Sequence, residues 1–169
     1  MTNLVVFAHG KESGPWGSKI TRLAAAAESF GANVLSPDYA DLPSPDARVE
    51  RLLALELPPY DQLVLVGSSM GGYVSTIASP KLNPAGLFLM APAFYLPGYG
   101  NRQPVPAAAH TVVVHGWHDE VVPVGQSIRF AHQHDATLHL LAGDHRLTDA
   151  LPDIEALFRD FLGRKLQWR

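Results

Sequence analysis

Short apolar runs alternate with segments of helical periodicity along most of this chain, and this alternation restricts the fold more than any other feature of the sequence. Several of the runs are almost continuously apolar, which is typical of parallel strands that are buried on both faces. The expected strands cover residues 4–8, 33–36, 62–66, 86–90, 111–114 and 137–141.

The segments between these runs have the apolar spacing of amphipathic helices, most clearly near the C-terminus. The expected helices cover residues 18–30, 45–57, 70–79, 124–134 and 152–165. Residues 91–110 contain four prolines and two glycines without a helical period, and we expect them to form a loop. The sequence therefore predicts an α/β fold with a six-stranded parallel sheet and helices on both faces, formed by a single domain over residues 1–169.

The composition is that of an ordinary globular protein, with 47% hydrophobic and 17% charged residues. The net charge of -3 and the scattered Lys and Arg residues provide no basic stripe for a phosphate backbone, so no nucleic-acid partner is expected. The absence of cysteine excludes disulfides, thiolate metal sites and a cysteine nucleophile. The apolar stretch after Met1 is too short for a signal peptide or a membrane span, so we expect a cytoplasmic location without membrane contact.

A Gly-x-Ser-x-Gly pattern lies between the run at 62–66 and the helix expected at 70–79, and Ser69 is its central serine. Such a pattern places a nucleophile on a sharp strand-to-helix turn, where glycines on either side avoid Cβ clashes. The N-terminus of the following helix also favours negative charge beside the serine. A glycine-rich turn without a catalytic role would have the same sequence, but the strand before it and the helix after it favour Ser69 as a nucleophile.

A serine hydroxyl is a weak nucleophile, so it needs a general base, and the base needs a third group to orient it. Suitable residues follow the fifth and sixth expected strands, at the sheet edge where open α/β sheets bind their ligands. Asp119 follows the fifth strand and His145 follows the sixth, which gives the chain order of nucleophile, acid and histidine that accompanies this motif. The sequence therefore predicts Ser69, Asp119 and His145 as a catalytic triad.

Other residues compete for two of these roles. His118 competes with His145 as the base, but it adjoins Asp119 on one turn and cannot easily be oriented by that acid while facing the nucleophile. Asp144 and Glu120 compete as the acid, although Asp144 adjoins the base and suits a turn or capping role. Asp119 is favoured by elimination, because the loop after the fourth strand begins without a carboxylate. The remaining candidates are expected to be structural or solvated histidines: His110, His115, His132, His134 and His139.

The first expected strand ends at a His-Gly pair, residues 9–10, and lies beside the strand that carries Ser69. Attack of this serine on a carbonyl group creates an oxyanion, which needs two preorganised hydrogen-bond donors. A loop softened by glycine and the residue after the nucleophile are suited to supply them. We therefore predict an oxyanion hole formed by the backbone N–H groups of Lys11 and Met70.

The segments at residues 9–10, 67–72, 115–123 and 143–145 together resemble the α/β-hydrolase superfamily, and the resemblance spans nearly the whole chain. It is strongest for the small bacterial serine esterase-like members that have no lid. The resemblance implies the strand order 2-1-3-4-5-6, a Ser-Asp-His triad and an oxyanion hole of backbone amides at the positions given above. The loop at 91–110 stands where many relatives insert a helical cap, so we expect no cap domain and an open site.

The first interpretation is a carboxylesterase that cleaves small or medium acyl esters through an acyl-enzyme, with a small-molecule ester as its partner. Thioester or peptide hydrolysis on the same fold, and a non-catalytic binding protein that retains the fold, are the alternatives. No cofactor or metal ion is expected, because neither a metal cluster nor a phosphate-binding loop is evident. The sequence leaves the oligomeric state open. Aromatic residues in loops near the expected site either line a substrate pocket or pack the loops. Trp16, Phe94 and Trp117 are the predicted substrate-binding residues, and Tyr95 and Tyr99 are further candidates.

Overall fold

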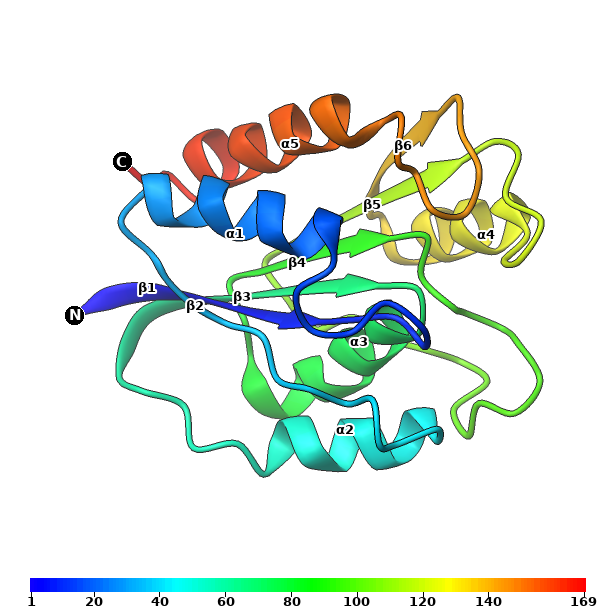
Figure 1. The fold of residues 1–169 in the computed structure, drawn as a ribbon, viewed down its shortest axis with the longest axis horizontal. Helices are drawn as coiled ribbons and strands as arrows, with labels where there is room; N and C mark the ends of the chain where they lie inside the picture. The colour runs from blue at the N-terminus through cyan, green and yellow to red at the C-terminus, as the bar shows by residue number, and fades with distance from the viewer.

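The computed structural model describes residues 1–169 as three layers, with a parallel sheet between two groups of helices (Figure 1). The sheet has the order β2-β1-β3-β4-β5-β6, as the resemblance implied. Its strands are β1 (Thr2–Ala8), β2 (Asn33–Leu35), β3 (Tyr60–Ser68), β4 (Gly86–Met90), β5 (His110–Gly116) and β6 (Thr137–Leu141). The helices are α1 (Ser18–Ser29), α2 (Pro45–Leu53), α3 (Met70–Leu82), α4 (Val124–His134) and α5 (Leu151–Asp160), and a π-helix (Phe161–Lys165) extends the last one.

Both faces of the four central strands are buried, because their successive residues point to opposite sides and meet helices on both. The edge strands β2 and β6 are only partly buried. On β1, Val5 and Phe7 belong to the apolar core that includes α1 and α5, whereas Leu4 and Val6 belong to the core that includes α2, α3 and α4. Figure 1 shows α1 and α5 on one side of the sheet and α2 with α3 on the other. The continuous apolar runs of the sequence therefore correspond to strands covered on both faces, as expected.

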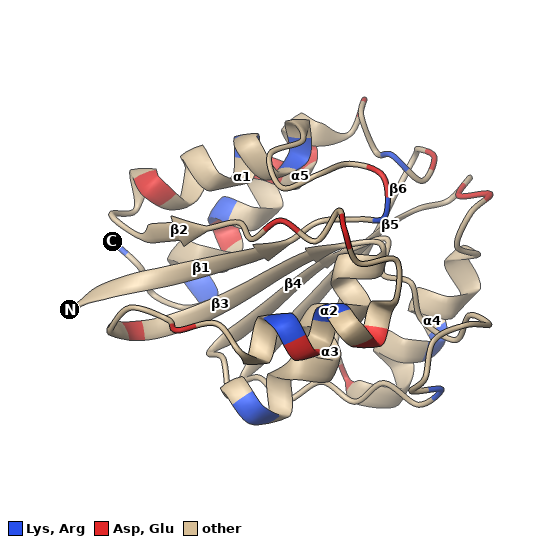
Figure 2. Cartoon of the chain, turned by 60° about the horizontal axis from the view of Figure 1, so that its bottom comes forward, with Lys and Arg blue, Asp and Glu red and all other residues tan.

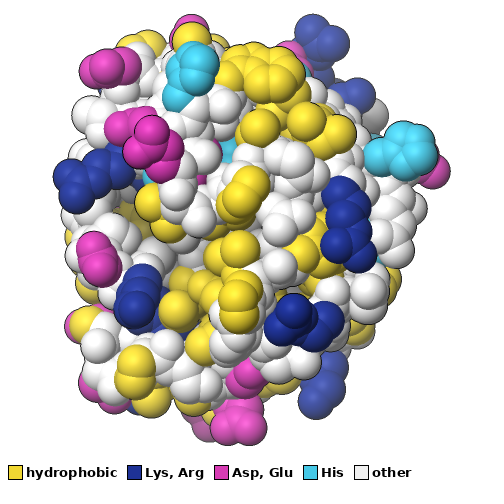
Figure 3. All heavy atoms as spheres, turned by 90° about the vertical axis from the view of Figure 1, so that its right-hand side faces the viewer, with side chains coloured by type: hydrophobic (Ala, Val, Ile, Leu, Met, Phe, Trp, Pro, Cys, Tyr) yellow, Lys and Arg dark blue, Asp and Glu magenta, His cyan; other side chains and the backbone are white.

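All six strands are parallel, so the loops that follow their carboxyl ends lie along one edge of the sheet. Figure 3 views the molecule from this edge. The loops after β3, β5 and β6 carry Ser69, Asp119 and His145 respectively. The topology therefore brings together residues that are remote in the sequence.

Residues 91–109 form a loop without a helix, so no cap domain covers this edge. The loop is fastened to α2 and α3 through a carboxylate and a phenol. The Tyr73 hydroxyl donates to Asp46 Oδ1 at 2.7 Å, while the N–H groups of Gly100 and Asn101 donate to Asp46 Oδ2 and the Tyr73 oxygen, each at 2.9 Å. The loop is thus held against the body of the molecule by side chains from two helices.

Helix α3 continues to Leu82, three residues beyond its expected end at Ser79. Pro80 lacks the N–H that would bond to the carbonyl of Thr76, and a proline normally ends or kinks a helix. In the structure the Ser79 hydroxyl donates to the Thr76 carbonyl at 2.7 Å. This side chain replaces the missing backbone donor, so the helix continues past the proline.

Gly71, in the first turn of α3, lies so close to the end of β1 that no side chain fits there. A Cβ atom at this position would lie 1.8 Å from the carbonyl oxygen of Ala8. We expect Gly71→Ala to lower the free energy of unfolding by at least about 3 kcal/mol, because backbone would have to move. Urea denaturation measures the change. Gly125→Ala on α4, where nothing lies within 4 Å, is the control, and an equal loss in both variants would contradict the packing argument.

Charged side chains of both signs are mixed on the surface. Figure 2 shows Lys or Arg beside Asp or Glu on α2, and Arg51 of this helix forms an ion pair with Asp41 at 2.6 Å. None of the helices combines the length and the apolar character that a membrane crossing requires.

Candidate active site

Ser69 occupies the turn between β3 and α3 with an unusual backbone conformation. Its φ of 54° and ψ of -117° lie outside the regions that residues with a Cβ atom favour. The N–H of Ser69 donates to the carbonyl of Met90, and its own carbonyl accepts from the N–H groups of Gly72 and Ala93, each at 2.9 Å. These bonds to the neighbouring strand end and loop hold the strained turn in place.

The glycines around this serine are required by close backbone contacts. A Cβ atom at Gly67 would lie 2.2 Å from the carbonyl oxygen of Gly71, and one at Gly71 would lie 1.8 Å from the carbonyl oxygen of Ala8. Both distances are far below ordinary van der Waals contact. The Gly-x-Ser-x-Gly spacing therefore has a direct steric cause in this fold.

The structure brings the side chains of Ser69, His145 and Asp119 into one hydrogen-bonded chain. The Nδ1 atom of His145 lies 2.6 Å from Asp119 Oδ2, and its Nε2 atom lies 3.0 Å from Ser69 Oγ. Since an ionised carboxylate only accepts hydrogen bonds, Nδ1 carries the proton and Nε2 is left to accept from the serine hydroxyl. This arrangement gives His145 the orientation that a general base for Ser69 requires.

The Asp119 carboxylate is buried and fixed by several donors. Its Oδ1 atom accepts from the N–H groups of Val121 and Val122 at 2.8 and 2.7 Å. Its Oδ2 atom accepts from His145, and Nε2 of His115 lies 3.0 Å from the same oxygen. The carboxylate cannot rotate without breaking several of these bonds, so it holds the imidazole of His145 in one orientation.

His115 is therefore part of this site, whereas the sequence suggested only a structural role for it. Its Nε2 atom also lies 3.0 Å from the carbonyl oxygen of Val122, and its Nδ1 atom lies 2.6 Å from Ser127 Oγ. Because Nε2 faces two acceptors it carries the proton, and the Ser127 hydroxyl donates to Nδ1. Burial lowers the pKa of His115 below its ordinary value of 6.5, so the ring stays neutral at neutral pH.

This burial predicts a loss of stability in mild acid. The unfolded chain takes up a proton on residue 115 near pH 6.5, whereas the folded chain resists it, so the free energy of unfolding falls as the pH drops below about 6.5. Burial lowers the pKa of His9 in the same direction. We expect His115→Gln to show a smaller fall between pH 7.5 and 5.5 in urea denaturation, because one of the two groups is gone. The exposed His132→Gln variant should keep the original slope; equal slopes in all three proteins would refute the assignment.

The competing residues lie outside the hydrogen-bonded chain. His118 is exposed, and its backbone N–H donates to the carbonyl of Gly143. Asp144 Oδ1 accepts from the N–H groups of Arg146 and Leu147, each at 3.1 Å, which is a turn role. Glu120 is exposed. None of the three side chains hydrogen-bonds to the nucleophile candidate or its histidine.

A cavity of about 940 Å³ lies beside the serine and the histidine of this chain. Lys11 and Met70, the two predicted oxyanion donors, both line it. Only 7 of its 22 lining residues are hydrophobic, so polar and charged residues outnumber apolar ones around it. Basic and acidic side chains both surround the hollow in Figure 3. The charged lining residues are Lys11, Lys19, Arg146, Glu12, Glu120 and Asp144.

The three aromatic residues predicted to bind substrate do not line this cavity. The prediction for Phe94 is wrong, because its ring is fully buried and packs against Phe130 of α4 with the ring centroids 4.3 Å apart. Trp16 and Trp117 are about half exposed, at 53% and 52%, and neither is among the residues that line the cavity. Tyr99 of the long loop, a further aromatic candidate from the sequence, does line it.

Lys19 is a lining residue that sequence reasoning missed. It lies in the first turn of α1, and its Nζ atom donates to the carbonyl oxygen of Arg146 at 2.9 Å. Burial lowers the pKa of the Lys19 amine below its ordinary value. The side chain thus ties α1 to the loop that carries His145. The only sequence signal for this role of Lys19 is its position directly after the loop that follows the first strand.

A sequence model described as the alpha/beta hydrolase family matches residues 5–166. A structure described as a hydrolase of the alpha/beta superfamily, from Xanthomonas campestris pv. campestris, is 32% identical with a TM-score of 0.82, and the match covers 96% of this chain and 98% of that one. A comparison with proteins of curated function found no match.

Two less similar structures share the fold. An alpha/beta serine hydrolase without a lid, also from Xanthomonas campestris, is 24% identical with a TM-score of 0.70 and covers 96% of this chain and 82% of its own. Est1E from Butyrivibrio proteoclasticus is 17% identical with a TM-score of 0.81 and covers 98% of this chain and 89% of its own. The family model and the 32% identical structure both match nearly the whole chain. The chain therefore belongs to the alpha/beta hydrolase family.

Proposed function

We propose that the chain is a serine hydrolase that cleaves carboxylic esters of small or medium acyl groups through an acyl-enzyme. The observation that carries the proposal is the continuous hydrogen-bonded chain from Ser69 Oγ through His145 to Asp119. A base that is oriented by a carboxylate and faces a serine hydroxyl is the arrangement that nucleophilic acyl transfer needs.

In the first half of the reaction, Ser69 Oγ attacks the ester carbonyl carbon while His145 Nε2 takes the hydroxyl proton. Asp119 keeps the Nδ1–H in place and stabilises the imidazolium that forms. The carbonyl oxygen becomes an oxyanion, which the backbone N–H groups of Lys11 and Met70 receive. When this intermediate collapses, His145 returns the proton to the leaving alcohol and the acyl group stays on the serine.

In the second half, water attacks the acyl carbon while His145 accepts a proton from it. The second oxyanion uses the same two donors. Its collapse passes the proton from His145 to Ser69 Oγ, which releases the carboxylic acid and restores the free enzyme.

Two features support Lys11 and Met70 as the donors. Met70 is the first residue of α3, where N–H groups have no partner within the helix. Lys11 lies outside the helices and strands, so its N–H makes no hydrogen bond within such an element. Its N–H is also absent from the backbone hydrogen bonds of the turns and loops. Both N–H groups are therefore free to receive an oxyanion at the cavity.

The cavity supports a preference for small or medium acyl groups. Polar and charged residues outnumber apolar ones around it, and no cap domain adds an apolar tunnel above it. A long acyl chain gains most of its binding free energy from burial of apolar surface, and without a cap its far end would stay in contact with water.

Matched substrate series test the proposal. We expect p-nitrophenyl esters to be hydrolysed with the highest kcat/KM for acetyl and butyryl groups, and a lower value for decanoyl. Thioesters of the same acyl groups should react more slowly. Faster thioester turnover at matched acyl length would make the chain a thioesterase, and no turnover in either series would favour the non-catalytic binding protein.

A further inference from the structure

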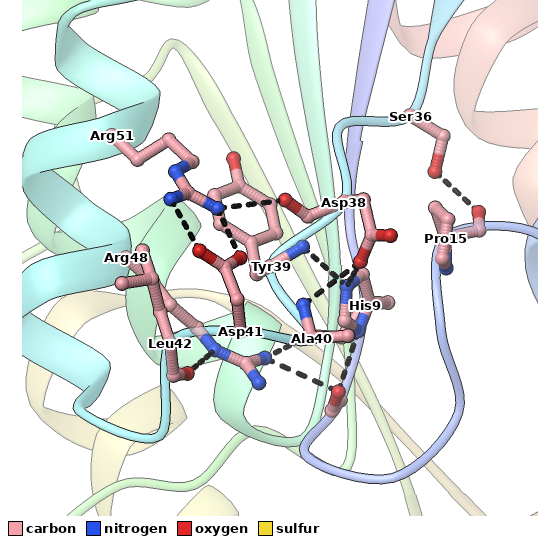
Figure 4. A network of polar contacts seen from close by, with 11 residues as sticks. His9, Pro15, Ser36, Asp38, Tyr39, Ala40, Asp41, Leu42, Arg48 and Arg51 are labelled. Carbon is pink, nitrogen blue, oxygen red and sulfur yellow. Dashed lines mark hydrogen bonds and ion pairs between the residues drawn. The ribbon is translucent and has the colours of Figure 1, made fainter.

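Arg48 of α2 is a buried cation without a carboxylate partner. Arg48 is only 1% exposed. It takes part in none of the ion pairs of the structure. A buried charge costs free energy, and proteins usually pair it with an opposite one. The nearby acids are engaged elsewhere, since Asp41 pairs with Arg51 and Asp38 Oδ1 accepts from the N–H of Ala40 at 2.8 Å (Figure 4). The position of Arg48 therefore calls for an explanation other than an ion pair.

The guanidinium of Arg48 donates to backbone carbonyls. Its Nε atom donates to Leu42 at 2.7 Å, and its Nη1 atom donates to His9 and Gly10 at 3.3 and 3.2 Å. The charge also lies 5.9 Å from the centre of the Tyr39 ring. Two of the three carbonyls thus belong to the loop after β1, directly before the proposed oxyanion donor.

His9 holds the same loop with its own ring. Its Nε2 atom accepts from the N–H of Tyr39 at 2.9 Å, so Nδ1 carries the proton and donates to the Gly10 carbonyl at 2.6 Å. The Gly10 carbonyl therefore accepts from two side chains, Arg48 and His9. Figure 4 shows both directed at this loop from buried positions.

The direction of the Gly10 carbonyl sets the direction of the Lys11 N–H, because both belong to one planar peptide unit. The chain has no cis peptide bonds, and in a trans unit the C=O and N–H point to opposite sides. Holding the oxygen toward Arg48 turns the N–H away from it. A Cβ atom built at Gly10 would lie 3.5 Å from the Cβ of Ser69, and Lys11 lines the same cavity as Ser69. The N–H therefore belongs to the segment that borders the serine.

We propose that Arg48 is a positioning residue for the oxyanion hole, which acts through the Gly10 carbonyl to hold the Lys11 N–H toward the charge that forms beside Ser69. This inference rests on the proposed function. A cation bonded to the carbonyl also polarises the peptide unit and strengthens its N–H as a donor. Its positive charge also favours a nearby oxyanion, and its burial leaves that charge little screened by water. The burial of an unpaired arginine then has a catalytic reason.

Arg48→Met tests the inference, because methionine keeps much of the side-chain length without the donors or the charge. Active sites are titrated from the burst of p-nitrophenol, so that kcat refers to correctly folded enzyme only. We expect kcat per titrated site to fall about 10- to 100-fold while KM changes less than about threefold. The Ki of a trifluoromethyl ketone, whose adduct with serine carries an oxyanion, should rise by the same factor as kcat falls.

Two further variants separate positioning from structure. Arg51→Met removes the neighbouring arginine of the same helix, which pairs with Asp41 near the surface, and should leave kcat per site within about twofold. Arg48→Lys keeps the charge but not the fork of donors, so its kcat should lie between those of the Met variant and the natural chain.

The inference is overturned if Arg48→Met has the kcat per titrated site of the natural chain. It is also overturned if Arg51→Met loses as much kcat as Arg48→Met does. A natural chain without a burst and without a covalent adduct would instead overturn the proposed function, and this inference with it. If Arg48→Met does not fold, a crystal structure of the natural chain with the trifluoromethyl ketone decides. The oxyanion is expected to accept from the Lys11 N–H, and an oxyanion that accepts only from other donors would refute the inference.

Discussion

Ser69→Ala is expected to lower kcat for ester hydrolysis by about 10⁴- to 10⁶-fold, because the variant has no atom that can form the acyl-enzyme. His145 and Asp119 would remain in place, but they would have no hydroxyl to activate. Residual hydrolysis would depend on water and the oxyanion donors alone. Steady-state kinetics with p-nitrophenyl butyrate measure the loss, and circular dichroism checks that the fold is kept.

The matched control is Ser75→Ala, which changes the same residue type in the following helix. Ser75 is buried, and its hydroxyl has no hydrogen-bond partner. Removing an unpaired buried hydroxyl should leave the stability unchanged or raise it, and the activity should stay at the natural level. A Ser69→Ala variant that keeps more than a tenth of the natural kcat would contradict the assignment of the nucleophile.

Asp119→Asn is expected to lower kcat by about 10⁴-fold, the effect of replacing a triad carboxylate by its amide. The amide nitrogen cannot accept from Nδ1–H of His145, so the imidazole would take the other tautomer and present an N–H to Ser69. The amide oxygen can still accept from Val121 and Val122, which keeps the loop in place. The histidine would therefore be present and yet unable to act as a base.

Glu120→Gln is the control for this loss, since it changes the adjacent carboxylate, which lines the cavity without contacting His145. Its kcat is expected to stay within about threefold of the natural value. Circular dichroism of both variants separates a catalytic effect from unfolding. Equal kcat values for the two variants would show that residue 119 does not orient the base.

The strands were predictable because burial on both faces makes their sequences almost continuously apolar. The ends of helices and strands were less predictable, since they depend on contacts with other parts of the chain. Helix α2 ends at Leu53 rather than at residue 57, and Leu55 and Leu57 pack against the core from the connection that leads to β3. Apolar residues at helical spacing therefore belong here to a connecting segment, and the sequence pattern made the helix look longer than it is.

The nucleophile and its two partners could be proposed from the sequence because parallel topology places the ends of β3, β5 and β6 at one edge. The supporting residues could not. In the sequence, Arg48 looks like an ordinary surface residue of an amphipathic helix. Only the fold reveals that its guanidinium is buried and hydrogen-bonded to the loop after β1. Phe94 was misplaced because the direction of a loop side chain depends on backbone angles, such as the left-handed φ of 59° at Tyr95.

Peptide mapping by mass spectrometry after reaction with a fluorophosphonate tests the central claim most directly. The reagent reacts with a serine that a neighbouring base activates, so the natural chain should carry one adduct, on Ser69, and Ser69→Ala should carry none. The Asp119→Asn variant should react far more slowly. An unmodified natural chain, or an adduct on any other residue, would contradict the account.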